Sequence, residues 1–572
     1  MSVTRLARTT LLAALLAGTA TIAARASGPD SLPPLDVVLA PHASGGIVDR
    51  MGVTLRIGQP AVKAGEALLR MPLTLVSTPT ARYDTAAITA QDDKGALILT
   101  AVEEEPTPTG VYRQWTVERD TVGDVTVRYA GPPRPVNAET RNGPLFDLRA
   151  EAGGVIGAGV YFYALPTRKE PYRIALKWDL SSMPAGSRGI WSLGEGAQET
   201  VGPADMLAFS FYAAGPVKSL PADGKGDYGF YWLSQPPFDP EALAVKTEKL
   251  YHYMSRFFED EGAPYRIFMR ANPYPAGGGT ALAKSFMFGY GSDGNTIAEG
   301  PDMLLAHEMA HNWPKLNGEE DHAETSWYTE GTAEYYAAIL ALRAGIIDHD
   351  KFLSVINAHA LSYYGNPYRT LSNKAAGEKY WSDARAQKIP YGRGFLYLIQ
   401  VDTQMRAASG GKRSLDDLVL EVLRRQRAGE KIGNAQWVEM VVRELGPDAK
   451  AAFDAMVAGQ PLVMPKASFA PCYQAVPTVT QAFELGFDEM RLGVVKNLRP
   501  GTAAAKAGVQ EDDTILSMTA LKLLRADPSL PMVLRVRRNG QEQTITYLPR
   551  GEEAPAYRWE RVAGTKDAAC KL

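Results

Sequence analysis

Two histidines and a glutamate share a short helical pattern in the middle of the sequence. His307 and His311 are four positions apart, and Glu308 directly follows the first histidine. Residues four apart lie on one face of a helix, so both imidazoles can reach one metal ion while Glu308 emerges beside them. This spacing is typical of zinc-dependent hydrolysis with the glutamate as general base. Because the pattern also arises by chance in helices, two surface histidines are the alternative on this motif alone.

A third candidate ligand lies in the next predicted helix. Glu330 follows His311 by nineteen positions, in the run WYTEGTAEYY. A catalytic zinc ion usually has three protein ligands and one open position, and two histidines with a glutamate form a known set. Gly331 would let the two helices approach closely, and Glu334 either accepts a hydrogen bond from a ligand histidine or is a solvated helix acid. The remaining histidines are expected on the surface or in packed positions rather than as ligands: His42, His252, His322, His349 and His359.

The run from His307 to Tyr335 resembles the gluzincin aminopeptidases. His-Asn-Trp in the first motif and Trp-x-x-Glu-Gly-x-x-x-Tyr in the second are most similar to the glycyl aminopeptidase family. The resemblance implies peptide or protein substrates and a single zinc ion. It further implies a β-rich N-terminal domain, a thermolysin-like catalytic domain and a C-terminal PDZ domain. The residues that match the site motifs are His307, His311 and Glu330 as metal ligands and Glu308 as the base.

One further segment of the sequence matches this family, and another departs from it. Tyr391, in Tyr-Gly-Arg-Gly, matches a tyrosine that stabilises the developing oxyanion, although a packed core tyrosine is the alternative. Related aminopeptidases carry a glutamate before the zinc helix that can hold the free amine of the substrate. The corresponding stretch from Gly277 to Ser285 contains no glutamate. Its glycines permit close backbone approach, but recognition of a free N-terminus is in doubt.

The periodicity of the sequence predicts a multidomain α+β protein. Short alternating segments such as Val125–Tyr129 and Tyr172–Trp178 predict a β-sandwich over residues 27–235. Asp239 and Pro240 then predict the start of a helix, and helical patterns dominate a catalytic domain over residues 236–464. Strands and turns return from 465 to 572, where Leu485-Gly486-Phe487 and the run from Leu498 to Gly508 resemble a PDZ domain. That module is expected either to bind peptides by strand addition or to be purely structural.

The two ends of the chain bear on its location. Arg5 and Arg8 precede an apolar run, and Ala24-Arg25-Ala26 resembles a cleavage site, so residues 1–26 predict an export signal; a membrane anchor is the alternative. A periplasmic or secreted protein is therefore expected, without stable membrane association after cleavage. Its only two cysteines, Cys472 and Cys570, then suggest one disulfide, with two free thiols as the alternative.

Composition and motifs leave three functional hypotheses. Sixty-one basic and 64 acidic residues give a net charge of −3, so no nucleic-acid partner is expected, and oligomeric state stays open. The leading hypothesis is a zinc aminopeptidase that releases small N-terminal residues such as glycine or alanine. The alternatives are a gluzincin endopeptidase, because of the altered 277–285 stretch, and a non-catalytic periplasmic scaffold that holds peptides with its PDZ-like module.

Overall fold

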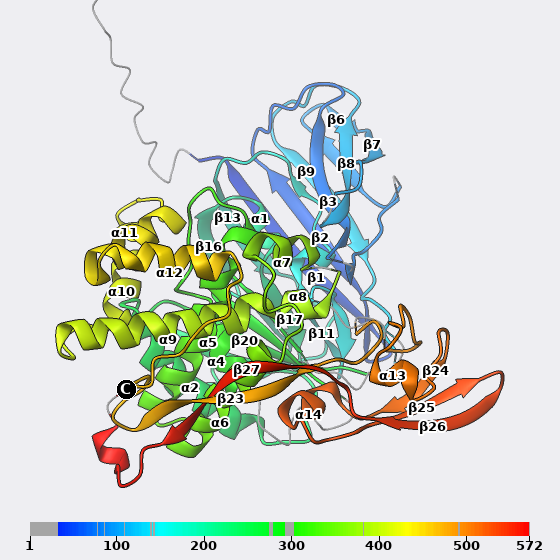
Figure 1. Ribbon diagram of the computed structural model, residues 1–572. Helices are drawn as coiled ribbons and strands as arrows, with labels where there is room; N and C mark the ends of the chain where they lie inside the picture. The colour runs from blue at the N-terminus through cyan, green and yellow to red at the C-terminus, as the bar shows by residue number, and fades with distance from the viewer. Residues whose placement is uncertain are drawn as a thin grey trace, which may run out of the picture.

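The computed structural model describes most of the chain. It describes residues 32–572 apart from 77, 85, 108, 138–139, 141–143, 274–277, 292–301, 381, 490–491 and 571. The predicted export signal and Gly277 lie outside the described residues. Within these limits, no helix has the length and apolar character needed to cross a membrane. The α+β class is confirmed, because several sheets and a group of helices form distinct parts of the molecule (Figure 1).

The N-terminal part is β-rich, as the alternating patterns predict. Along its first strand Leu35, Val37 and Leu39 are almost fully buried, while the residues between them are partly exposed. This period of two places one face of each strand on a shared core. Sheet one has the order β16 (Gln198–Gly202), β13 (Tyr172–Trp178), β1 (Pro34–Ser44), β2 (Ile47–Ile57), β9 (Val125–Gly131), β5 (Thr89–Asp92), β6 (Gly95–Leu97).

Two further sheets complete this domain and share its core. One has the order β12 (Leu165–Pro166), β3 (Ala67–Leu75), β8 (Gly110–Val117), β7 (Leu99–Glu103), with β4 (Thr78–Pro79) beside β3. The other has the order β10 (Arg149–Glu151), β11 (Gly154–Ala158), β17 (Phe211–Gly215), β14 (Arg188–Trp191), β15 (Gly194–Glu195). Helix α1 (Asp205–Ala208) is a single turn.

The predicted domain boundary at residue 235 divides a hydrogen-bonded sheet. β18 (Lys218–Leu220) and β19 (Tyr228–Trp232) lie in one sheet with β20 (Tyr265–Ala271), β22 (Ser285–Tyr290) and β21 (Gly278–Leu282). β19 pairs in parallel with β20, and a parallel pair needs a long crossover between its strands. α2 (Pro240–Phe257) is that crossover, so the helix whose start is predicted at Asp239 lies inside the second domain rather than at its edge.

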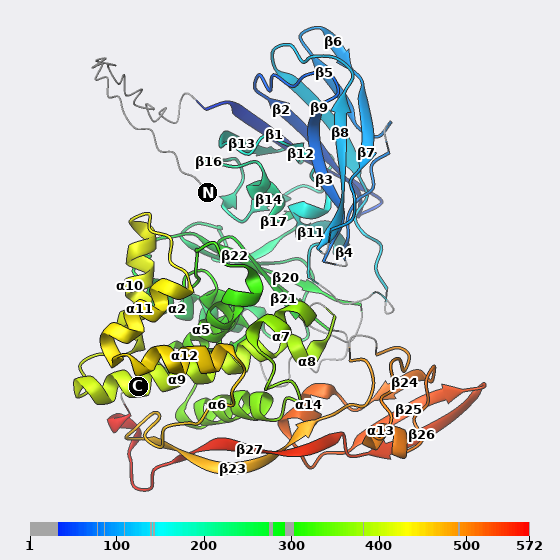
Figure 2. The ribbon, with the colours of Figure 1, turned by 45° about the horizontal axis from the view of Figure 1, so that its top comes forward.

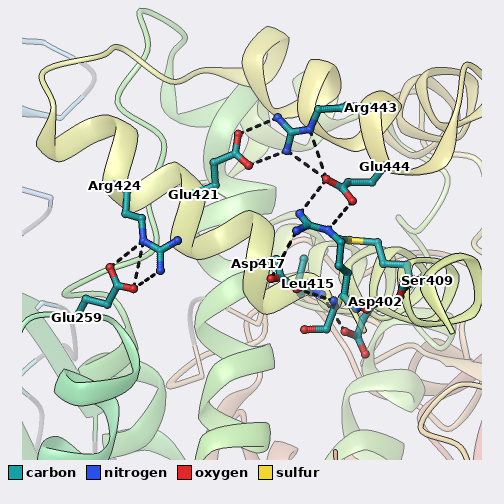
Figure 3. Close-up of polar contacts among 12 residues, drawn as sticks. Glu259, Asp402, Ser409, Leu415, Asp417, Glu421, Arg424, Arg443 and Glu444 are labelled. Carbon is teal, nitrogen blue, oxygen red and sulfur yellow. Dashed lines mark hydrogen bonds and ion pairs between the residues drawn. The ribbon is translucent and has the colours of Figure 1, made fainter. Parts of the chain in front are cut away.

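Helices form the rest of the catalytic region, as predicted. They are α4 (Asp302–Ala310), α5 (His322–Arg343), α6 (His349–Tyr364), α7 (Asn373–Lys379), α8 (Ala384–Gln387), α9 (Ile389–Ser409), α10 (Leu415–Arg427), α11 (Asn434–Leu445) and α12 (Asp448–Val457). Gly446 and Pro447 separate α11 from α12. Arginine–glutamate pairs tie α10 to its neighbours: Arg443 of α11 contacts both Glu421 and Glu444, and Arg424 pairs with Glu259 (Figure 3).

A long strand pair carries the C-terminal segment along the helices. β23 (Tyr473–Phe483) pairs with β27 (Arg550–Arg561), and both run beside α6 (Figure 2). The outer part has its own small core, formed by α13 (Ala503–Lys506), α14 (Leu521–Ala526), β24 (Thr514–Met518), β25 (Met532–Arg538) and β26 (Gln541–Tyr547). Cys472 and Cys570 form a disulfide, which confirms the predicted pairing. Cys472 and Tyr473 belong to the core of the helical region, so the module is not separate from it at residue 465.

A buried charged cluster joins the N-terminal domain to the catalytic sheet. Asp147 is 1% exposed and accepts a hydrogen bond from Arg149 Nε at 2.9 Å, and its main-chain oxygen accepts one from Arg270 Nη1 at 2.7 Å. Arg270, on β20, also contacts the Asp147 carboxylate. Burial alone would raise the pKa of Asp147, but Arg270 and Arg149 outweigh it and hold the pKa below its usual range.

Replacement of Asp147 by asparagine should therefore destabilise the protein. The substitution removes the Asp147 charge that pairs with the buried Arg270, and loss of one partner of a buried pair costs about 3–5 kcal/mol. Because the folded-state pKa lies below the ordinary value of about 3.9, this stabilisation is present at neutral pH and is lost as pH falls below about 4. Denaturant unfolding at pH 7 measures the loss, and Glu170→Gln, at an exposed pair with Arg168, is the control. Equal stability of the two variants would contradict this role.

Candidate metal centre

Two helices that pack against each other bring the predicted ligands together. α4 carries His307, His311 follows its last residue, and α5 carries Glu330. His307 Nε2 and His311 Nε2 are 3.0 Å apart, and Glu330 Oε2 lies 3.4 Å from the first and 3.5 Å from the second. Ligand atoms at about 2.0–2.2 Å from a tetrahedral ion lie about 3.3–3.6 Å from one another. Both distances to Glu330 fall in this range and the histidine nitrogens lie slightly closer, so a small side-chain adjustment lets the three side chains fit a single metal ion.

Burial of these side chains supports the same interpretation. Glu330 Oε2 is buried and has no hydrogen bond of good geometry among the described residues. A carboxylate oxygen in that state is costly unless a cation compensates it. Burial acts to raise the pKa of Glu330, but His307 and His311 outweigh it and keep the pKa below its usual range. The carboxylate is thus held ionised, the form that binds a metal ion.

A second carboxylate lies behind the first histidine. Glu334 Oε2 is 3.4 Å from His307 Nδ1 and 3.3 Å from His359 Nε2, so one oxygen lies between two imidazoles. Burial would raise the pKa of Glu334, but His359 and His307 lower it to about 2. The contact with Nδ1 directs the lone pair of His307 Nε2 toward Glu330 and His311. Of the two possibilities for Glu334, the contact with a ligand histidine is the one the structure supports.

His359 has a role that the sequence did not indicate. It lies on α6, which the sequence analysis did not predict, and its ring packs against Phe395 of α9 with ring centroids 4.7 Å apart. The expectation that it is packed rather than a ligand agrees with this position. The only local signal is the helical spacing of the buried residues Phe352, Ile356, Ala360 and Tyr363 around it.

The glycine beside Glu330 permits a close helix crossing, but with a different helix from the one expected. A Cβ on Gly331 would lie 2.6 Å from the carbonyl carbon of Gly394, and one on Gly394 would lie 2.0 Å from the main-chain oxygen of Trp327. α5 and α9 therefore approach at a contact that admits no side chain on either residue. α9 carries Tyr391 in its first turn, so this crossing brings the tyrosine to the ligands.

Tyr391 lies against the metal ligands. Its ring stacks on that of His307, with centroids 5.7 Å apart and an interplanar angle of 14°. The ammonium group of Lys388 lies 4.7 Å from the centre of the tyrosine ring. Burial raises the pKa of Tyr391 well above its ordinary value, so the hydroxyl keeps its proton and can act as a hydrogen-bond donor.

The predicted base lies in the same place. Glu308 follows His307 on α4 and is half-buried, and burial raises its pKa while the two histidines oppose the shift. A raised pKa suits a carboxylate that accepts and then returns a proton. His307, His311, Glu308, Glu330 and Tyr391 all line one cleft.

This cleft lies between the two domains and has a volume of about 1150 Å³. One wall comes from the N-terminal domain, including Thr74, Val76 and Phe146. The other comes from β21 and the metal-binding helices. β21 is the last strand of its sheet among the described residues, so its outer edge faces no other strand. Leu145 N–H donates to Thr280 Oγ1 at 2.8 Å and ties the two walls together.

Comparisons with known proteins agree with this centre. Residues 302–390 match the family model described as M61 glycyl aminopeptidase, and the match ends one residue before Tyr391. No curated protein matches the sequence. An aminopeptidase N family protein from Idiomarina loihiensis has a similar structure: TM-score 0.62, 14% identity, 92% of this chain and 98% of that chain covered.

A more distant structure is an M1 zinc metallopeptidase from Deinococcus radiodurans. It has a TM-score of 0.46 and 18% identity, and the similarity covers 76% of this chain and 94% of that chain. The similarity to the Idiomarina protein shows a shared fold. The match to the M61 family supports a metallopeptidase.

Glu334→Gln should weaken metal binding without unfolding the protein. A neutral amide cannot hold His307 in the required tautomer as a carboxylate does, and comparable changes cost 10–100-fold in metal affinity. Competition with a chromogenic chelator measures the Zn²⁺ dissociation constant. Glu319→Gln, at an exposed acid between the two helices, is the matched control. An unchanged dissociation constant in Glu334→Gln would show that the contact does not support the metal.

Proposed function

We propose that this protein is a zinc peptidase whose metal ligands are His307, His311 and Glu330. The observation that supports this most strongly is the convergence of three donor atoms in an open cleft, where Glu330 Oε2 is buried and has no hydrogen bond of good geometry to the described residues. A site of this kind leaves one coordination position for substrate or water. The donor set of two imidazoles and one carboxylate suits zinc.

Glu308, Tyr391 and Glu334 have separate roles in hydrolysis. When bound, zinc polarises the peptide carbonyl and lowers the pKa of a water molecule. Glu308 takes the proton of the attacking water and passes it to the nitrogen of the departing amine. Tyr391 donates its hydroxyl hydrogen to the oxyanion that develops at the carbonyl. Glu334 keeps His307 oriented throughout.

The free edge of β21 suits an extended peptide. Its main-chain N–H and C=O groups on that edge pair with no strand among the described residues, and it lines the same cleft as the ligands. A substrate can add to such an edge as a further strand, which fixes the backbone while leaving side-chain choice to the walls. Its glycines, Gly278 and Gly279, allow the two backbones to approach.

The family match supports an aminopeptidase that releases small N-terminal residues. One observation favours the alternative, an endopeptidase: the described part of β21 carries no carboxylate that would hold a free amine. Among the described residues that line the cleft, the only carboxylates are Glu308 and Glu330, and both already have roles. Recognition of a charged N-terminus must therefore come from outside this set, or be absent.

We also propose a location and a role for the C-terminal segment. The Cys472–Cys570 disulfide supports an oxidising compartment such as the periplasm, as residues 1–26 predict. The outer module, with buried Leu485 and Phe487, its own small core and only six residues in α14, supports a reduced PDZ-like domain.

Glu308→Gln should abolish turnover while zinc stays bound. Loss of the general base lowers the rate by a factor of about 10²–10⁴, and the amide leaves the three ligands in place. Hydrolysis of aminoacyl chromogenic substrates and of an unstructured protein gives the rate, and metal analysis gives zinc content. Glu319→Gln is again the control. Normal activity in Glu308→Gln, or a folded parent protein that binds no zinc, would overturn the assignment.

The choice between exo- and endopeptidase can be tested on one peptide mixture. An aminopeptidase should cut peptides with free N-termini and spare their acetylated partners, and it should release glycine and alanine fastest. Mass spectrometry of the products distinguishes the two modes. Equal cleavage of free and acetylated peptides would refute the aminopeptidase and leave the endopeptidase.

A further inference from the structure

A second, smaller cavity lies where the C-terminal module meets the catalytic helices. The end of α6, the α8–α9 connection, β23, α14 and the start of β27 enclose about 40 Å³. A water molecule needs about 10–15 Å³ on this measure, so the cavity has room for roughly three waters or one small polyatomic ion. It is separate from the metal cleft and shares no lining residue with it.

The cavity has an excess of positive charge. Four cationic side chains line it, against a single carboxylate, Glu489. Two of the cations are neutralised: Arg385 pairs with Asp383 at 2.6 Å, and Arg525 pairs with Glu489. The remaining two, Lys388 and Arg550, have no carboxylate within ion-pair distance in the described part of the chain.

These two cations are held without countercharge. Arg550 donates only to main-chain oxygens, at 2.8 Å to Asp527, 3.1 Å to Pro528 and 3.0 Å to Pro549, and also to Leu524. The ammonium of Lys388 rests on the ring of Tyr391. Burial lowers the pKa of both groups and outweighs the opposing attraction of Glu334 on Lys388 and of Asp527 on Arg550, so neither charge is fully compensated.

We propose that this cavity binds a small oxyanion, a carboxylate or a phosphate, which Lys388 and Arg550 recognise. Both side chains line this cavity of ionic size, and cations at such a position can form charge-assisted hydrogen bonds to an oxyanion, which are stronger than neutral ones. The ligand comes either from free phosphate or from the carboxylate of a small acid or amino acid. The planar carboxylate and the tetrahedral phosphate both present negatively charged oxygens, which a guanidinium and an ammonium group bind.

The position of Lys388 couples this site to the metal centre. Lys388 immediately precedes α9, and Tyr391 lies in the first turn of that helix. An anion that draws the ammonium into the cavity weakens its contact with the Tyr391 ring. This part of the inference rests on the proposed function, because it assumes that Tyr391 acts on the substrate. The effect should appear in kcat rather than in KM, since Tyr391 is proposed to act on the oxyanion.

Binding can be measured on the full-length protein without reference to activity. Inorganic phosphate, acetate and glycine are titrated calorimetrically at constant ionic strength set with chloride. Binding of phosphate but not of acetate or glycine would identify phosphate as the ligand. Binding of acetate and glycine but not of phosphate would identify a carboxylate. We expect saturable binding of at least one probe, with a dissociation constant at least tenfold weaker in Arg550→Gln and in Lys388→Gln. Lys63→Gln, which removes an exposed lysine of the N-terminal domain, should bind as the parent does.

Two results would overturn the site. One is no saturable binding of any probe by the parent protein. The other is equal binding by the parent and both variants, which would indicate a general salt effect. Lys388→Gln keeps the test decisive if Arg550→Gln fails to fold, since the side chain of Lys388 makes no hydrogen bond to the described residues. The coupling is tested separately as the change in kcat at saturating anion. A protein that binds the anion but lacks peptidase activity would refute the proposed function and leave the site intact.

Discussion

The crossing of α5 and α9 is the contact on which the metal centre depends. Gly331 and Gly394 meet at a separation that leaves no room for a Cβ on either helix. Glu330 precedes the first glycine, and Tyr391 lies about one turn before the second. The two helices thus fix the backbone positions of a predicted metal ligand and of the tyrosine relative to each other. The side chains themselves are held by their neighbours, such as the His307 ring against Tyr391.

A second constraint gives the metal centre its opposite wall. The Asp147 cluster anchors an N-terminal-domain loop to β20, and the next residues toward the cleft are Phe146 and Leu145. Since Leu145 also bonds Thr280 on β21, the loop is held at two points on the catalytic sheet. The cleft is therefore a property of both domains together, and neither would form it alone. The buried charges add a fixed polar contact to an interface that also contains apolar packing, because Tyr231, Phe268 and Met287 of the second sheet belong to the core of the N-terminal domain.

Much of this centre could be predicted from the sequence, because its signals are local. The spacing of His307 and His311 and the capping residue Asp239 depend only on helical geometry, and the structure places all of them as expected. Glu330 could be predicted because two histidines and one glutamate form a known zinc ligand set. Its position close to the histidines, however, depends on how the helices pack in the fold. The sequence could not reveal His359, since it reaches Glu334 only through the packing of α6 on α9.

The sequence also misplaced the domain boundary and missed the β21–β22 hairpin. β19 reads as the last strand of a β-rich region, and only its parallel pairing with β20 assigns it to the next domain. The Gly-rich run at β21 has weak strand propensity, so its extended form comes from pairing with β22. The break between α11 and α12 is a local signal, because Gly446 and Pro447 both disfavour a continuous helix.

The uncovered edge of β21 has a consequence for aggregation. An exposed strand edge is a template on which other chains can stack, and soluble proteins usually cover or charge it. Here the N-terminal domain stands across from that edge and leaves only a cleft. Thr74, Val76 and Phe146 of the N-terminal domain line the opposite side of this cleft. The wall that bounds the cleft therefore stands on the side from which a second molecule would have to approach in order to pair with this edge.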